Sequence, residues 1–127
     1  MNLLLDTHAA LWIVSSPERV GAGAARAYRA GGDVFLSVAS LWEMANKVGV
    51  GKLHLAPGWA HSLPTALARD GVRLLNVEAD DCLRLSTLPL HHRDPFDRML
   101  VAQALQRRLA ILSVDKALGP YGVRVVW

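Results

Sequence analysis

Cysteine is almost absent from this chain, and long apolar runs are absent altogether. Of its 127 residues only Cys82 is a cysteine, which excludes an intrachain disulfide and a zinc site built from thiolates. We expect this thiol to be buried rather than nucleophilic, because leucines surround it and no base lies near it in the sequence. The apolar run at the start ends at Asp6, too early for a signal peptide, and no other run is long enough to span a membrane. These absences predict a soluble, cytoplasmic protein with no membrane partner.

The chain also lacks a glycine-rich phosphate loop, because Gly21 and Gly23 have neither a preceding strand nor the rest of that fingerprint. Aromatic residues make up only 6% of it, and its four tryptophans are expected in the core or at an interface rather than as stacking platforms for bases. The charge balance is mildly basic, with 14 Lys and Arg against 11 Asp and Glu. A positive surface attracts polyanions, but charge at this level does not by itself indicate nucleic-acid binding.

Hydrophobic residues make up 52% of the chain, enough for a substantial core, and the length predicts one domain spanning residues 1–127. Short apolar runs alternate with helical patterns, which predicts a three-layer α/β fold with a mainly parallel sheet between helices. Strands are predicted at Leu3–Leu5, Val34–Leu36, Val72–Leu75, Ala110–Val114 and Val123–Val126. Helices are predicted at Thr7–Val14, Gly23–Ala30, Ser40–Val48, Gly58–Asp70, Glu78–Leu85 and Pro95–Arg107.

Four acidic residues fall where this pattern brings strand ends and helix beginnings together. Asp6 and Asp115 each follow a predicted strand, while Glu43 and Asp97 lie in the first turn of predicted helices. In a parallel sheet with crossover helices these positions share one edge, and ligands bind at that edge. Carboxylates gathered without Cys or matched His are the ligands that a hard divalent cation prefers. The pattern therefore favours metal-assisted chemistry on phosphate.

Each of these acids also has a structural explanation, because all of them lie where a helix cap is needed. Ser40 and Glu43 have the spacing of a capping box, and Asp94 and Asp97 have that of an N-cap followed by a favourable first-turn acid. Serine, threonine or asparagine would cap equally well, however, whereas convergent carboxylates raise each other's pKa unless a cation screens them. Metal binding is therefore the favoured interpretation.

Two adjacent histidines, His91 and His92, precede Asp94 and suggest a metal or general-base site at first sight. Adjacent histidines seldom bind one ion. We therefore expect this segment to be a solvated loop.

Four parts of the chain occur in an order that is typical of one nuclease family. They are Leu3–His8, Ser40–Glu43 with Gly51–Leu53, His92–Arg98 with Ala102–Ala104, and Ser113–Asp115. In these parts, and over the chain from Leu3 to Trp127, the sequence closely resembles the PIN-domain nucleases, and within them the VapC-type toxins of toxin–antitoxin pairs. The stretch His92–Arg98 is the most specific match.

The resemblance implies a PIN-like fold whose five-stranded parallel sheet has the strand order 3-2-1-4-5. Asp6, Glu43, Asp97 and Asp115 carry over as the catalytic, metal-binding acids. Asp94 also carries over as an outer-shell carboxylate, and Thr7 and Ser113 as hydrogen-bonding partners of the acids or of a metal-bound water. Our own candidates for contacts with the RNA backbone beside the site are the basic residues Arg93, Arg98, Lys47, Lys52 and Lys116.

The activity that the resemblance implies is that of an endoribonuclease, a hydrolase that cleaves RNA phosphodiesters with a metal-activated water. One or two Mg²⁺ or Mn²⁺ ions would be the cofactor, and the products would carry a 5′-phosphate and a 3′-hydroxyl. The implied partners are an RNA substrate, a second copy of the chain in a homodimer, and a small cognate antitoxin. A segment of that antitoxin would block the acidic pocket, with an Arg reaching the carboxylates.

Other classes fit the residues less well. A phosphatase of the haloacid dehalogenase type needs a second Asp two residues after the first, where this chain has His8. A response-regulator receiver needs an Asp on the third strand and a Lys after the fifth, which Leu74–Asn76 and Arg124–Val126 do not supply. A non-catalytic PIN-fold module for RNA binding or assembly stays open as the alternative, although such a module would usually have lost one of the four acids.

Overall fold

Five parallel strands form the centre of the protein, in the order β3-β2-β1-β4-β5. The computed structural model describes residues 1–127. The strands are β1 (Leu3–Leu5), β2 (Val34–Ser37), β3 (Arg73–Leu75), β4 (Ala110–Leu112) and β5 (Val125–Val126). The predicted α/β fold class and strand order are confirmed.

Six α-helices and two short 3₁₀ helices connect the strands. They are α1 (Thr7–Ser15), η1 (Pro17–Arg19), α2 (Ala22–Arg29), α3 (Val38–Gly49), α4 (Trp59–Ala68), α5 (Ala79–Thr87), α6 (Pro95–Arg107) and η2 (Lys116–Tyr121). Helix α6 has the predicted bounds, because Asp94 caps it and Pro95 is its first residue. Helix α3 begins two residues earlier than predicted, since the hydroxyl of Ser37 accepts the Ala39 N–H at 3.0 Å and caps it there. None of the helices combines the length and hydropathy that a membrane-spanning segment requires.

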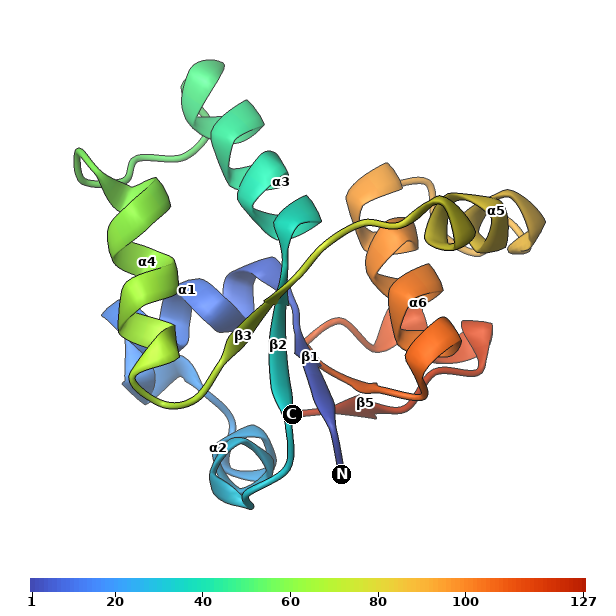
Figure 1. Cartoon of the computed structure of the whole chain (residues 1–127), viewed down its shortest axis with the longest axis horizontal. Helices are drawn as coiled ribbons and strands as arrows, with labels where there is room; N and C mark the ends of the chain where they lie inside the picture. The colour runs from blue at the N-terminus through green and yellow to red at the C-terminus, as the bar shows by residue number, and fades with distance from the viewer.

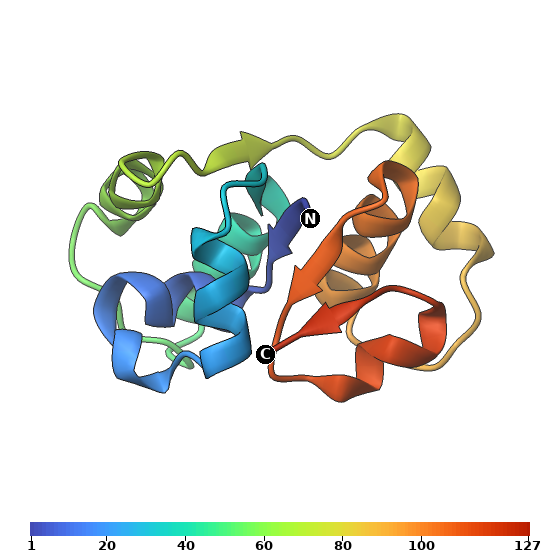
Figure 2. The same ribbon diagram turned by 90° about the horizontal axis from the view of Figure 1, so that it is seen from below.

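Helices cover both faces of the sheet, so its central strands are buried on both sides. Figures 1 and 2 show α1, α2 and α4 on one side of the sheet and α5 and α6 on the other. Leu3 and Leu5 of β1 belong to the cluster under the first group of helices, and Leu4 belongs to the cluster under α6. All three leucines are fully buried. This two-sided burial explains why β1 reads as a continuous apolar run rather than an alternating one.

The carboxyl edge of the sheet is where chain segments distant in the sequence meet. Leu5 and Leu112 are register partners in β1 and β4, and Leu5 and Leu36 are partners in β1 and β2. Helices α1 and α3 follow their strands after at most one residue, so both helices begin at this edge. Helix α6 contacts α3, and its N-terminus points to the same edge (Figure 1).

Helix α5 lies at the outside of the fold, where it packs along α6. This position corrects the expectation for Cys82, whose thiol is exposed rather than buried. The leucines around it in the sequence do not enclose it, because Leu83 is itself exposed and only one side of α5 faces the protein.

A buried ion pair joins α5 to α6. The side chain of Asp81 is 1% exposed, and its two oxygens accept hydrogen bonds from Arg107 Nη1 at 2.6 Å and Nη2 at 3.0 Å. The same carboxylate accepts the backbone N–H of Glu78 at 2.9 Å and so completes the capping box of α5. Burial disfavours the charged carboxylate, but the hydrogen bonds and the positive charge of Arg107, together with the hydrogen bond from the Glu78 backbone, outweigh it and hold the pKa of Asp81 below its ordinary value.

Replacing Arg107 with Met should lower the free energy of unfolding by about 3 kcal/mol, because Asp81 would stay buried without its counterion. Folding lowers the pKa of Asp81, so the pair stabilises the protein at pH values above about 4, the ordinary pKa of Asp. This stabilisation is lost as the pH falls through the lowered pKa of the folded state. Urea unfolding at pH 7 and at pH 3 measures both effects. Asp80→Asn, an exposed change in the same turn, should cost less than about 0.5 kcal/mol. An R107M midpoint equal to that of wild type at pH 7 would contradict the assignment.

Candidate active site at the carboxyl edge of the sheet

Asp6 and Asp115 extend from neighbouring strands and share one hydroxyl group. Asp6 directly follows β1, and its buried carboxylate accepts a hydrogen bond from Ser113 Oγ at 2.6 Å. The same oxygen of Ser113 accepts the backbone N–H of Asp115 at 2.9 Å. Strand β4 ends at Leu112, two residues before the predicted end, so Ser113 lies between the strand and Asp115 and links the two acids.

The capping roles of these two acids differ. Asp6 occupies the N-cap position of α1, but its side chain makes no capping hydrogen bond, so a helix cap does not explain it. Asp115 does cap η2, because one of its oxygens accepts the Ala117 N–H at 2.9 Å. The structural explanation therefore accounts for one of the two residues and leaves the buried Asp6 without one.

Glu43 lies in the second turn of α3, not in its first turn as expected, because Ser37 rather than Ser40 is the N-cap. This register turns the Glu43 side chain into the protein, where it is buried. One carboxylate oxygen accepts a hydrogen bond from Thr7 Oγ1 at 2.6 Å, and the other pairs with Lys47 Nζ at 2.5 Å. The hydrogen bond to Glu43 is the main reason why the pKa of Lys47 is raised.

Asp97 carries the most strongly shifted carboxyl group of the site. It lies in the first turn of α6, behind the N-cap Asp94, whose Oδ1 accepts the N–H groups of Phe96 and Asp97 at 2.8 and 3.1 Å. Burial, followed by the negative charges of Asp6, Asp94 and Glu43, raises the pKa of Asp97 to about 7. Burial also raises the pKa of Asp6, against the opposing hydrogen bond from Ser113.

The contribution of neighbouring negative charges to both shifts indicates that the carboxylates lie near enough to repel one another. A divalent cation would remove that repulsion, and every oxygen donor of the cluster is of the kind that Mg²⁺ and Mn²⁺ prefer. The donor set therefore fits a hard cation held by Asp6, Glu43, Asp97 and Asp115. Asp94 is less available, because its Oδ1 already caps α6.

His92 belongs to this cluster, although the sequence suggested a solvated loop. Its side chain is largely buried, and its Nε2 lies 3.5 Å from one oxygen of Asp97 and 3.5 Å from one of Asp115. These three groups are mutually close enough to surround one ion. One signal in the sequence could have indicated this position: His92 stands two residues before the N-cap Asp94. At that distance its ring can accept the Asp94 N–H and lie against the first turn of α6.

The predicted basic contacts separate into three kinds. Lys47 points into the acidic cluster. Arg98 donates to the carbonyl oxygens of Leu85, Leu88 and Pro89 and to the hydroxyl of Tyr121, so its guanidinium ties the end of α5 to α6 and η2. The remaining residues, Arg93, Lys52 and Lys116, are exposed.

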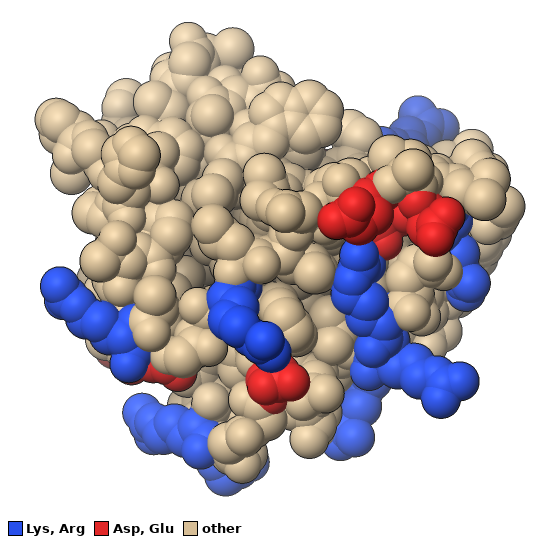
Figure 3. All heavy atoms as spheres, viewed as in Figure 1, with Lys and Arg blue, Asp and Glu red and all other residues tan.

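Charged side chains are unevenly distributed over the molecule. Figure 3 shows acidic side chains gathered over α5 and a broad area over α3 and α4 without charge. Helix α4 indeed contains no Asp, Glu, Lys or Arg. Trp42 of α3, expected in the core or at an interface, is 66% exposed and contacts Phe96 edge-on at 5.1 Å between ring centroids. These rings directly precede Glu43 and Asp97 in the chain, so an aromatic pair joins the two helices that carry these acids.

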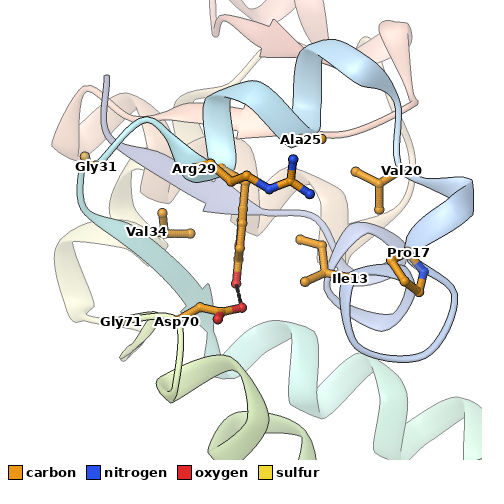
Figure 4. Close-up of a pocket in the computed structure, with 11 residues that line it drawn as sticks. Ile13, Pro17, Val20, Ala25, Arg29, Gly31, Val34, Asp70 and Gly71 are labelled. Atoms are coloured by element: carbon orange, nitrogen blue, oxygen red, sulfur yellow. Dashed lines mark hydrogen bonds between the residues drawn. The ribbon is translucent and has the colours of Figure 1, made fainter.

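A cavity of about 440 Å³ lies at the other edge of the sheet, where β2 and β3 begin (Figure 4). Inside it the hydroxyl of Tyr28 donates to Asp70 at 2.9 Å, and burial with this carboxylate raises the pKa of Tyr28. None of the four acids Asp6, Glu43, Asp97 and Asp115 lines this cavity. The candidate active site is therefore the carboxyl edge and not this cavity.

Replacing Asp97 with Asn should raise the melting temperature of the metal-free protein at pH 8 by about 5 °C, because it removes a buried charge that its neighbours repel. Folding raises the pKa of Asp97, so the folded state binds this proton more tightly than the unfolded chain. The free energy of unfolding of the metal-free wild type should therefore fall as pH rises from about 4 to about 7. Thermal melts in EDTA at several pH values test this, with Asp80→Asn as the control. A D97N protein no more stable than wild type at pH 8 would refute it.

Comparisons with known proteins agree with this geometry. The model of the PIN domain family matches residues 3–121. The sequence matches none of the curated proteins with which it was compared.

Among solved structures, the fold is similar to a chain of VapBC2 from Rickettsia felis bound to a promoter DNA fragment, with a TM-score of 0.74 and 11% identity over 98% of this chain and 97% of that one. It is also similar to FitAcB from Neisseria gonorrhoeae, with a TM-score of 0.61 and 21% identity over 97% and 95% of the two chains. A chain of a toxin–antitoxin complex from Klebsiella pneumoniae is similar with a TM-score of 0.63 and 19% identity, over 98% of this chain and 96% of that one. With its sheet order, its acidic edge and a family match over nearly its whole length, the chain belongs to the PIN-domain family.

Proposed function

We propose that this protein is a Mg²⁺- or Mn²⁺-dependent endoribonuclease and the toxin of a toxin–antitoxin pair. PIN domains are a nuclease family, which supports a hydrolase acting on nucleic acid. The observation that carries the proposal is the convergence of carboxylates on one edge, where burial and then the negative charges of Asp6, Asp94 and Glu43 raise the pKa of Asp97. Carboxylates in this arrangement destabilise the folded protein unless a bound cation neutralises their charge.

Asp6, Glu43, Asp97 and Asp115 are the residues that would hold the metal, and Asp94 would act from the outer shell. When bound, a divalent cation neutralises phosphate charge and makes water more acidic, so no protein nucleophile is needed. Thr7 and Ser113 hold Glu43 and Asp6 in place through hydrogen bonds of 2.6 Å each. Such bonds fix which carboxylate oxygens remain free for a cation.

RNA is the proposed substrate, and two kinds of group near the acids support it. Lys47, Arg93 and Lys116 lie in or beside the acidic edge, where positive charge attracts a phosphate backbone. Trp42 offers an exposed ring next to Glu43, and unpaired bases stack on such rings without sequence preference. A single-stranded substrate would use both kinds of contact.

The toxin role rests on the solved structures of similar fold, several of which are toxin–antitoxin complexes. A cognate antitoxin would inhibit this protein most directly by placing an Arg among the carboxylates, since a guanidinium pairs with carboxylate in two-pronged geometry. A homodimer in the cytoplasm is the proposed working form. The alternative is a non-catalytic PIN-fold module that binds RNA, which would keep the fold but not need four metal-competent acids.

The purified protein should cut total cellular RNA when Mg²⁺ or Mn²⁺ is added and should be inactive in EDTA. Asp6→Asn is expected to reduce cleavage by at least about 100-fold, because it removes a charge from the metal site while keeping the size of the side chain. Asp80→Asn, far from the site on α5, should cut as wild type does. Gel analysis with end-labelled RNA measures this and reports the product termini. Cleavage that survives D6N would reveal a contaminating nuclease, and RNA binding without cleavage would favour the alternative.

Induced expression of the wild-type chain in a bacterial host should arrest growth, whereas D6N should not, because the proposed toxicity requires the metal site. Co-expression of a small open reading frame next to the gene should restore growth if it encodes the antitoxin. Growth curves and co-purification of the two proteins provide the measurement. Equal growth arrest by wild type and D6N at equal protein levels would contradict a catalytic toxin.

A further inference from the structure

The hydrogen bonds around His92 define which of its ring nitrogens carries a proton. The backbone N–H of Asp94 donates to His92 Nδ1 at 3.1 Å, so Nδ1 must present a lone pair. A neutral imidazole with an unprotonated Nδ1 carries its proton on Nε2. Nε2 is the nitrogen that faces Asp97 and Asp115, at 3.5 Å from each.

This tautomer conflicts with metal ligation by His92. A histidine that binds a metal through Nε2 must present a lone pair there and usually donates its other N–H to an oxygen. In this protein Nδ1 faces a donor rather than an acceptor, so ligation through Nε2 would need the ring to lose both protons or to turn away from Asp94. Three groups that look like one His–Asp–Asp ligand set therefore divide into two acceptors and one donor.

We propose that His92 is a positioning residue, which bridges Asp97 and Asp115 through its Nε2–H and is not itself a metal ligand. Asp97 is on α6 and Asp115 follows β4, so the two acids come from different elements that pack against each other. A donor between them would give the two carboxylates a common partner, 3.5 Å from one oxygen of each. This inference rests on the proposed metal-binding role of the acids.

The backbone of His92 is anchored independently of its side chain. Its N–H donates to the hydroxyl of Tyr121 at 2.8 Å, and Tyr121 is buried. Arg98 donates to the same hydroxyl at 3.2 Å and to the carbonyl of Pro89 at 2.9 Å, which ties down the segment before His92. A change of the His92 side chain therefore leaves the loop held, and this makes the residue suitable for substitution.

The tautomer is tested directly by long-range ¹H–¹⁵N correlation spectra of the metal-free protein in EDTA. His92 should give the pattern of an Nε2–H imidazole, with its signals assigned by their loss in His92→Gln. This readout depends on neither metal nor activity. An Nδ1–H pattern for His92 would overturn the proposal.

Metal affinity tests the positioning role, with calorimetric titration of Mg²⁺ and of Mn²⁺ into each protein. His92→Ala should lower the affinity for both metals by a similar factor of about 10, as expected when a group that orients the ligands is lost. His92→Gln, whose amide offers an N–H at a similar reach, should stay within about 3-fold of wild type. His61→Ala, which removes an exposed histidine of α4, should bind both metals as wild type does.

The outcomes separate this inference from the proposed function. If H92A loses much more affinity for Mn²⁺ than for Mg²⁺, and H92Q does not restore it, His92 is a nitrogen ligand and the proposal is overturned. Unchanged affinity in H92A would overturn it as well. Failure of wild type to bind either metal would instead contradict the proposed metal-dependent function, and the spectra would still decide the tautomer.

Discussion

Repulsion between buried carboxylates is the constraint on which the organisation of this protein depends. Asp6 and Glu43 are buried and Asp97 is partly buried, and burial, followed by the negative charges around Asp97, raises its pKa to about 7. Such a cluster would separate if the chain allowed it. The fold prevents separation because each acid is fixed to an element whose other residues are committed to the core, as Asp6 is by the three fully buried leucines of β1. Hydrophobic burial of this kind is worth about 1.5–3 kcal/mol per side chain, enough to offset unfavourable charge nearby.

Each acid also has a local partner, and the partners differ in kind. Asp6 accepts from Ser113, Glu43 from Thr7 and Lys47, and Asp97 and Asp115 face the same nitrogen of His92. Hydroxyl and imidazole donors stabilise negative charge without a formal positive charge of their own, so they do not compete strongly with a cation. These donors can therefore hold the carboxylates together while most of their negative charge stays uncompensated, as a metal site requires.

The sequence predicted the features that depend on local signals and on topology. Helix α6 was predicted from end to end because Asp94 and Pro95 are strong start signals, and the strand order followed from the family resemblance. The prediction that Glu43 lies in the first turn of its helix was wrong, because Ser37 and Ser40 are equally good caps in the sequence and only the end of β2 decides between them. Cys82 and His92 were misplaced for a related reason, since burial depends on how α5 and the loop before α6 pack, which no local pattern encodes.

Lys47 illustrates how one side chain can serve both states of such a site. Its ammonium pairs with Glu43, and the hydrogen bond to Glu43, followed by the negative charges of Glu43, Asp94 and Asp97, raises its pKa. In the metal-free protein it supplies one positive charge to the cluster, while burial and the neighbouring negative charges still raise the pKa of Asp97 to about 7. A divalent cation binding Glu43 would displace this ammonium, and its flexible, partly exposed stem would leave it at the rim. If the proposed function holds, its charge would there meet a phosphate oxygen instead, so the group that shields the acids without metal would also contact substrate when metal is bound.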